Sequence, residues 1–202
     1  MKLYDMRSGL NPRRVRIFLA EKGLELPKVE VDMVKGDNRT AEFLALNPLG
    51  TLPVLELDDG TVLTESIAIC RYLEELHPDP PLFGVDPVDR AKVEMWNRRA
   101  ELEILVPATG AFIHGHKFWE GRRRQVPDYA VLARETALER FAWLDRELAT
   151  REYLAGPRYT VADITLQCSL VLAKNTGLPV PEGCINLQRW FAAVSARPTA
   201  RA

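Results

Sequence analysis

The segment NPLGTLPVLELDDGTVLTES, residues 47–66, is the part of the sequence that decides the fold. It opens with an NPLG turn, and Pro53 follows shortly after the turn. Two short apolar runs, residues 54–57 and 61–63, are then separated by Asp-Asp-Gly, a signal for a β-hairpin. The segment ends at Ser66, directly before apolar residues with helical spacing. It therefore predicts a turn, two antiparallel strands and the start of a helix.

Two features of this segment are suited to binding a ligand. If the Leu52–Pro53 bond is cis, the backbone groups of Leu52 turn outward and can pair with an extended, peptide-like ligand. Glu65 and Ser66 stand at a helix start, where free N–H groups and the helix dipole attract a carboxylate. Each feature also has an ordinary explanation, since most X-Pro bonds are trans and a serine before a helix usually caps it. Their occurrence together favours the binding interpretation.

The segment resembles the thioredoxin-like domain of the cytosolic glutathione transferases, which carries N-P-x-G-x-x-P, a hairpin and then E-S-x-A-I-x-x-Y-L. Residues 47–53 read NPLGTLP, and residues 65–73 read ESIAICRYL. The resemblance implies that Pro53 is cis and that Leu52 pairs through its backbone with the cysteinyl part of glutathione. It also implies that the Glu-Ser pair receives the γ-glutamyl end of glutathione, the co-substrate.

The composition is that of an ordinary globular protein. The chain has 202 residues, 47% of them hydrophobic and 27% charged, and a formal net charge of −1. A charge this close to zero argues against bulk attraction to nucleic acid or to a membrane. No apolar run approaches the roughly 20 residues that span a bilayer, and the N-terminus lacks the apolar core of a signal peptide. We therefore expect a cytoplasmic protein that binds neither nucleic acid nor membrane.

The cysteines and histidines do not indicate a metal. The three cysteines are far apart, odd in number and without a C-x-x-C motif, so neither a disulfide framework nor a zinc site is expected. Cys70 and Cys168 lie in apolar helical patterns and are expected to be buried. His114 and His116 form an H-x-H pair that no carboxylate or cysteine motif accompanies, and we predict no metal there.

Residues 1–77 are expected to form a small α/β domain. In its first helix, Asn11 is predicted as the N-cap and Pro12 as the first helical residue. The strand–helix–strand opening favours a parallel pair with a right-handed crossover. The expected elements are a strand at 2–6, a helix at 11–22, a strand at 29–31, a helix at 39–46, strands at 54–57 and 61–63, and a helix at 67–76. This mixed sheet with its helices is the thioredoxin-like plan.

The proline-rich residues 78–87 are expected to be a linker. Every element after it, in residues 88–202, has a helical pattern. The fold class predicted from the sequence is therefore an α/β thioredoxin-like N-terminal domain followed by an all-α C-terminal helical domain.

The helical domain carries two local signals. Its first helix, residues 88–119, is expected to kink or split at Pro107 and Gly110. Further along, Thr160 at an N-cap with Asp163 after it makes a variant of the capping box. That helix start also resembles the transferase family, in which its role is folding and not chemistry.

The reaction that the resemblance implies needs a thiolate at neutral pH. A free thiol has a pKa of about 8.5, and lowering it by about two units corresponds to about 2.7 kcal/mol. One hydroxyl or amide donor at a helix N-terminus supplies energy of that order. The first turn offers Tyr4, Ser8 and Asn11, and it contains no cysteine of the kind that forms mixed disulfides with glutathione.

We favour Ser8 as the catalytic donor, by resemblance to serine-type family members, with Asn11 second, by resemblance to a bacterial asparagine-type branch. Both have ordinary explanations, a solvated turn serine and a helix cap, and Tyr4 is expected in the core. For the glycyl carboxylate, Thr51 is a weaker partner than the lysine or glutamine of several relatives. Lys35 or Arg39 is the alternative, although ordinary solvation is the favoured explanation of both.

The second substrate is expected between the sheet domain and helix 88–119. The residues expected to line its pocket are Glu101, Ile104, Leu105, Ala108, Phe112 and His114. The basic loop at residues 122–124 is a further candidate for attracting anions, though such loops are usually solvated surface. The resemblance also implies a homodimer.

The sequence therefore predicts a glutathione transferase that conjugates the glutathione thiolate to an electrophilic small molecule. Two alternatives remain on the same scaffold. One is a glutathione-dependent disulfide or peroxide reductase, favoured if Asn11 is the main donor. The other is a non-catalytic glutathione-binding protein.

Overall fold

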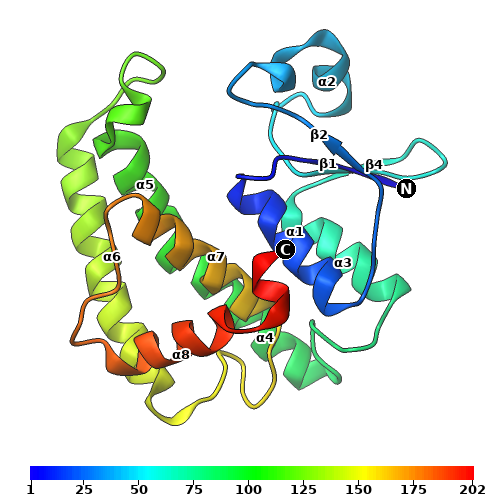
Figure 1. Cartoon of the computed structure of the whole chain (residues 1–202). Coiled ribbons are helices and arrows are strands. Elements are labelled where there is room, and N and C mark those ends of the chain that lie inside the picture. The colour runs from blue at the N-terminus through cyan, green and yellow to red at the C-terminus, as the bar shows by residue number, and fades with distance from the viewer. The chain divides into compact units, whose positions relative to one another are not determined.

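The computed structural model describes the whole chain, residues 1–202. Its residues form two compact units, Met1–Leu82 together with Arg201–Ala202, and Phe83–Ala200. The first unit combines a sheet with helices, and the second is built from helices (Figure 1). None of the helices has both the length and the apolar character needed to cross a membrane.

The first unit is built around a four-stranded mixed sheet. Its elements are β1 (Lys2–Asp5), α1 (Leu10–Glu21), β2 (Lys28–Glu30), η1 (Asp37–Arg39), α2 (Ala41–Leu46), β3 (Val54–Glu56), β4 (Val62–Thr64) and α3 (Ser66–Leu76). The strand order is β2-β1-β3-β4, with β1 parallel to β2 and the other two pairs antiparallel. The predicted thioredoxin-like plan is confirmed.

Buried apolar side chains cover both faces of this sheet. Leu3 and Leu55, opposite each other on β1 and β3, are completely buried. Val54 joins a separate cluster with Phe43 and Leu52, because successive residues of a strand point to opposite faces. Figure 1 shows α1 and α3 on one side of the sheet and α2 on the other. The cluster of Val54 and Phe43 therefore anchors the side chain of Leu52.

Helix α1 begins earlier than the sequence predicts. Its N-cap is Gly9, which has extended dihedral angles, so the prediction of Asn11 as the N-cap is wrong. Asn11 and Pro12 are instead the second and third helical residues. Proline is tolerated there because the N–H groups of the first helical turn have no intrahelical acceptor. The exposed side chain of Asn11 is consequently not used as a cap.

From Pro87 onward the regular structure is helical, as predicted. The elements are α4 (Pro87–Arg99), η2 (Ala100–Leu105), α5 (Val106–Gly115), η3 (Lys117–Trp119), α6 (Pro127–Glu147), η4 (Leu148–Thr150), α7 (Val161–Asn175), α8 (Ile185–Ser195) and η5 (Pro198–Arg201). Helix α7 is central to the second unit, since it packs against α4, η2, α5 and α8.

The long helix predicted for residues 88–119 is shorter and bends differently. It ends at Gly115, and its irregular part is the π-helical segment Ala100–Leu105. This segment ends two residues before Pro107, whose ring excludes the regular hydrogen bond to the preceding turn. Gly110 does not break the helix. A Cβ at that position would lie 3.1 Å from an aromatic carbon of α6, so the glycine allows the two helices to pack closely.

The start of α7 confirms the capping-box prediction. Asp163 accepts hydrogen bonds from the N–H of Thr160 at 3.0 Å and from its hydroxyl at 3.1 Å. It also accepts from the N–H of Leu154 at 3.0 Å and from the indole of Trp190 at 3.0 Å. The Asp163 side chain is completely buried. Burial raises the pKa of this carboxyl to about 6, against the effect of its hydrogen bonds.

Candidate functional site

Leu52 presents two backbone groups that the rest of the chain does not use. Its side chain is buried, and the Leu52–Pro53 bond is cis. Strand β3 begins only at Val54, so the N–H and C=O of Leu52 take no part in the sheet, and no other group of the chain bonds them. Because protein backbone groups are almost always paired, these two are available to a peptide-like ligand.

The loop before Leu52 is fixed by two buried asparagines. The side-chain amide of Asn47 donates to the carbonyl of Thr51 at 2.9 Å and to its hydroxyl at 3.0 Å. The amide of Asn38 donates to the carbonyl of Gly50 at 2.7 Å. The backbone that leads to Leu52 is therefore held from two sides, and the hydroxyl of Thr51 already has a partner.

The N-terminus of α3 is open. Its N-cap, Glu65, has a φ of 66° and gives no side-chain cap, although a non-glycine residue at positive φ costs on the order of 1–3 kcal/mol. Ser66 is buried, and its hydroxyl accepts a hydrogen bond from Nη1 of Arg14 at 3.2 Å. The N–H groups of the first turn point out of the helix end, where they suit a carboxylate.

Arg39 and Lys35, the two candidates for a glycyl carboxylate, have different surroundings. Arg39 lies against the Asn47 loop, since a Cβ on Gly50 would come within 2.7 Å of its guanidinium. The Lys35 side chain is 77% exposed and pairs with Asp32 at 3.4 Å. The structure thus brings Arg39 next to the loop that ends at Leu52, whereas Lys35 is engaged elsewhere.

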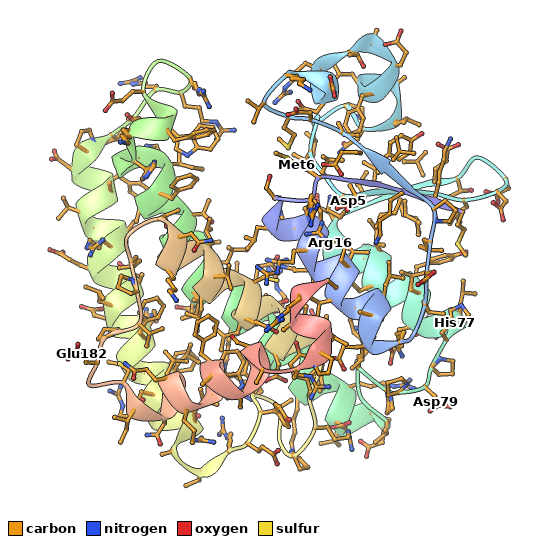
Figure 2. All side chains as sticks on the ribbon, in the orientation of Figure 1. Asp5, Met6, Arg16, His77, Asp79 and Glu182 are labelled. Atoms are coloured by element: carbon orange, nitrogen blue, oxygen red, sulfur yellow. The ribbon has the colours of Figure 1, made fainter.

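A buried ion pair supports the turn between β1 and α1 (Figure 2). Nη1 of Arg16 bonds the Asp5 carboxylate at 2.6 Å, and their side chains are only 8% and 5% exposed. The same guanidinium donates to the carbonyl of Met6 at 3.1 Å and to that of Arg7 at 2.8 Å. Ser8 follows Arg7 in the sequence. Its position therefore depends on the backbone that Arg16 holds through the carbonyls of Met6 and Arg7.

Ser8, directly before the N-cap of α1, and Asn11, in the first turn of α1, are polar side chains that the chain does not use. Both residues are exposed, and neither side chain forms a hydrogen bond within the chain. The hydroxyl of Tyr4, in contrast, donates to Glu56 at 2.8 Å, and its ring packs edge-on against Phe43. The structure therefore leaves Ser8 and Asn11 as candidate donors to a ligand at the start of α1.

The residues predicted to line a second-substrate pocket differ in their exposure. Ile104 and Ala108 are completely buried, and η2 and α5, which carry them, pack against α7. Burial removes these two side chains from any surface that a ligand reaches. Glu101, Leu105 and Phe112 are partly exposed.

The two histidines of the H-x-H pair have separate partners. Nδ1 of His114 accepts the N–H of Val126 at 3.2 Å, and its ring packs edge-on against Tyr129 at 5.1 Å. Nδ1 of His116 accepts the N–H of Phe118 at 3.1 Å. His114 therefore faces α6 and stabilises the connection between α5 and α6. No group of three or more His, Cys, Asp or Glu side chains in the chain is placed to hold a metal ion.

Two family models match the chain. The model for the glutathione S-transferase N-terminal domain covers residues 10–76, and the model for the glutathione S-transferase C-terminal domain covers residues 99–198. The chain belongs to the glutathione S-transferase family.

Curated relatives match the whole chain or part of it. Glutathione S-transferase 2 of Saccharomyces cerevisiae is 38% identical over 205 residues, covering 100% of this chain and 88% of that protein. Maleylacetoacetate isomerase of Pseudomonas aeruginosa is 44% identical over 94 residues, covering 46% of this chain and 44% of that protein.

Solved structures show the same fold. A glutathione S-transferase domain-containing protein from Marinobacter aquaeolei is 42% identical with a TM-score of 0.90, over 98% of this chain and 99% of that one. Gtt2 from Saccharomyces cerevisiae is 38% identical with a TM-score of 0.93, over 100% of this chain and 99% of that one.

Sequence reasoning missed three residues that support the candidate site: Arg14, Arg16 and Asn38. All three are buried polar side chains that contact segments elsewhere in the fold. A signal for the two arginines was present, because they flank the buried Val15 in a helix that covers a sheet. A charged residue in such a place requires a partner. Asn38 had no comparable signal.

Proposed function

We propose that this protein joins the thiolate of glutathione to an electrophilic small molecule. The observation that carries the proposal is the unused backbone pair of Leu52, in the same unit as the open start of α3. An extended tripeptide with a carboxylate at each end suits both features, since main-chain groups pair with Leu52 and a carboxylate suits first-turn amides. Membership of the family supports glutathione as that tripeptide.

In the proposed orientation, the cysteinyl part of glutathione pairs with Leu52, and the γ-glutamyl end lies at Glu65 and Ser66. The γ-glutamyl carboxylate accepts from the amides of α3, and its ammonium group meets the carboxylate of Glu65. The glycyl carboxylate is assigned to Arg39 in preference to Lys35, because Arg39 packs against the loop before Leu52 whereas Lys35 pairs elsewhere.

The thiol of glutathione is proposed to ionise at the start of α1, with Ser8 as the main donor and Asn11 as the second. Support comes from their exposed side chains, which have no partner in the chain. The N–H groups of the first turn of α1 add the positive end of the helix dipole. A hydroxyl and a helix dipole together favour the anion without any cysteine. This assignment makes the protein a serine/asparagine-type transferase.

The electrophile is proposed to contact the partly exposed face of η2 and α5. The partly exposed Leu105 and Phe112 are proposed to supply apolar contact there, and Glu101 is the acidic member of the predicted set. The two fully buried members of the predicted pocket, Ile104 and Ala108, are then the packing layer beneath it.

The test follows thioether formation from glutathione and 1-chloro-2,4-dinitrobenzene by absorbance. We expect a rate well above the uncatalysed one that saturates with both substrates. A calorimetric titration with glutathione measures binding separately. Arg39→Gln should weaken glutathione binding, whereas the matched variant Lys35→Gln should leave it unchanged. A titration without heat, together with no thioether formation, would rule out the proposal.

A reductase is the second candidate, and the uncommitted side chain of Asn11 is the observation that favours it. Reduction of 2-hydroxyethyl disulfide by glutathione, coupled to glutathione reductase, distinguishes the two activities. Disulfide reduction that Asn11→Ala abolishes, without thioether formation in the first assay, would favour the reductase. Glutathione binding with neither activity would favour the non-catalytic alternative.

We also propose that the protein is a homodimer through the second unit. Large apolar side chains on neighbouring helices of this unit are exposed: Met95 40%, Leu102 49%, Val106 49%, Tyr129 43% and Leu132 58%. Four of them line or border a cavity between the α5 region and α6. A contiguous apolar surface of this kind is typical of a protein–protein contact.

The compartment proposed for the reaction is the cytoplasm. The three cysteines, Cys70, Cys168 and Cys184, are buried and form no disulfide. Cysteines that form no disulfide suit a reducing compartment, since disulfides persist mainly outside the cytosol. Fractionation of cells with an antibody to the protein tests this assignment.

A further inference from the structure

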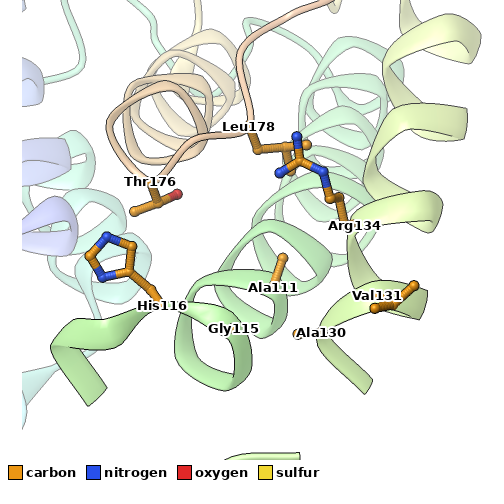
Figure 3. A pocket seen from close by; sticks show the side chains of 8 residues that line it. All are labelled: Ala111, Gly115, His116, Ala130, Val131, Arg134, Thr176 and Leu178. Carbon is orange, nitrogen blue, oxygen red and sulfur yellow. The ribbon is translucent and has the colours of Figure 1, made fainter. Parts of the chain in front are cut away.

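A cavity in the second unit involves none of the residues assigned to glutathione or to the electrophile. Its volume is about 210 Å³, and α5, the first part of α6 and the end of α7 border it (Figure 3). Small residues, Ala111, Gly115 and Ala130, line its base. A Cβ on Gly115 would lie 3.1 Å from the Cβ of Ala130, so the helices touch there. Larger side chains at these positions would close the space.

The polar side chains at this cavity come from opposite sides. Figure 3 shows His116 and Thr176 on one side and Arg134 on the other. The hydroxyl of Thr176 is already bonded to the carbonyl of Leu172 at 2.9 Å. Nδ1 of His116 accepts the N–H of Phe118 at 3.1 Å. In the neutral ring the proton is therefore on Nε2, which is a hydrogen-bond donor.

Arg134 is a cation without a carboxylate partner in the chain. Its Nη1 donates to the carbonyl of Gly177 at 2.9 Å. A guanidinium has about five N–H donors, so the other nitrogens remain available. No acidic residue lines the cavity. The side chains therefore offer donors and a positive charge, with no carboxylate to compete for them.

We infer that this cavity binds a small organic carboxylate with an apolar body. The planar guanidinium of Arg134 matches a carboxylate in shape and charge, and Nε2 of His116 offers a second donor. The apolar body lies against the small residues at which α5 and α6 touch, with Val131 and Leu178 as further apolar lining.

The size of the cavity limits the ligand class. Pockets for drug-sized ligands are typically about 300–1,000 Å³, and this one has about 210 Å³. A monocarboxylate of the size of benzoate is the expected class, and a whole glutathione molecule is excluded. The inference does not depend on the proposed reaction, because none of its residues takes part in that reaction.

The test is a calorimetric titration of the full chain with benzoate and with benzamide, in saturating S-methylglutathione. The saturating ligand blocks the glutathione site, so any remaining heat belongs to another site. We expect benzoate to bind in the millimolar range and benzamide, which has the same shape without the charge, at least tenfold more weakly. Arg134→Gln should weaken benzoate binding about tenfold, a change of about 1.4 kcal/mol. The control Arg140→Gln, on the same helix but outside the cavity, should leave it unchanged.

A second variant tests the space inside the cavity separately from the positive charge of Arg134. Ala111→Leu fills the cavity without changing its charge, and it should abolish benzoate binding while the thermal melt stays cooperative. Three outcomes would overturn the inference: no heat from benzoate, affinity unchanged in folded Arg134→Gln, or displacement of benzoate by S-methylglutathione. An assay of thioether formation by the same preparation of the wild-type protein tests the proposed reaction. Its result is independent of the result for benzoate binding.

Discussion

Ser8 precedes the N-cap of α1 and Asn11 lies in its first turn, and the proposed ranking of Ser8 above Asn11 as the thiolate donor gives the first prediction. Ser8→Ala removes the proposed hydroxyl donor to the thiolate, and we expect it to lower kcat by tenfold or more, about 1.4 kcal/mol. Asn11→Ala should lower it less. Steady-state kinetics with glutathione and 1-chloro-2,4-dinitrobenzene measure both. Full activity of Ser8→Ala, with loss in Asn11→Ala, would transfer the donor role to Asn11.

Arg16 is proposed as a positioning residue, since its guanidinium bonds Asp5 and the backbone carbonyls of Met6 and Arg7. Arg16→Lys keeps a positive charge beside Asp5 but loses the planar fork that reaches Met6 and Arg7. We expect kcat to fall severalfold, with the calorimetric affinity for glutathione nearly unchanged. Equal activity with a lower midpoint of urea unfolding would show that Arg16 acts on stability alone.

At the scale of elements, the start of α7 makes a prediction about pH. Burial raises the pKa of Asp163 from 3.8 to about 6, so the folded protein holds this proton more tightly than the unfolded chain. The stability that this group contributes is therefore complete at low pH and is lost as the pH rises from 3.8 to about 6. The loss is about 3 kcal/mol over that window.

The measurement compares the wild type with Asp163→Asn, which cannot titrate at this position. The free energy of urea unfolding of the wild type, minus that of the variant, should fall as the pH rises through the window. Other carboxyl groups cancel in this difference because both proteins carry them. A difference that stays constant with pH would contradict the raised pKa.

The elements that the sequence predicted well are those with local signals. Asp-Asp-Gly between apolar runs, and Thr160 before Asp163, each act within a few residues, and both predictions are confirmed. The start of α1 was placed two residues too late, because Asn-Pro fits both a cap and a first turn. The partners of residues that act over long separations could not be found this way. Arg14, for example, reaches Ser66, which is 52 residues away.

At the scale of the whole molecule, the exposed apolar surface of the second unit predicts the oligomeric state. Leu132→Glu places a charge in the proposed interface and should convert dimers to monomers, which sedimentation velocity measures. Val131→Glu is the matched control, since Val131 is 57% exposed on the same helix but lies at another cavity. A wild-type protein that sediments as a monomer at all concentrations would contradict the dimer.

The backbone of Glu65 has a wider consequence. Its φ of 66° suits glycine, yet an acidic side chain stands there. Glycine would relieve the torsional strain, so Glu65→Gly should raise the melting temperature of the unliganded protein. The same change removes the negative charge proposed for the ammonium group of the ligand. At this one position, the thermal stability of the protein and its recognition of the amino group of glutathione therefore favour different residues. Acylating that amino group of glutathione should weaken binding to the wild type and make little difference to the glycine variant.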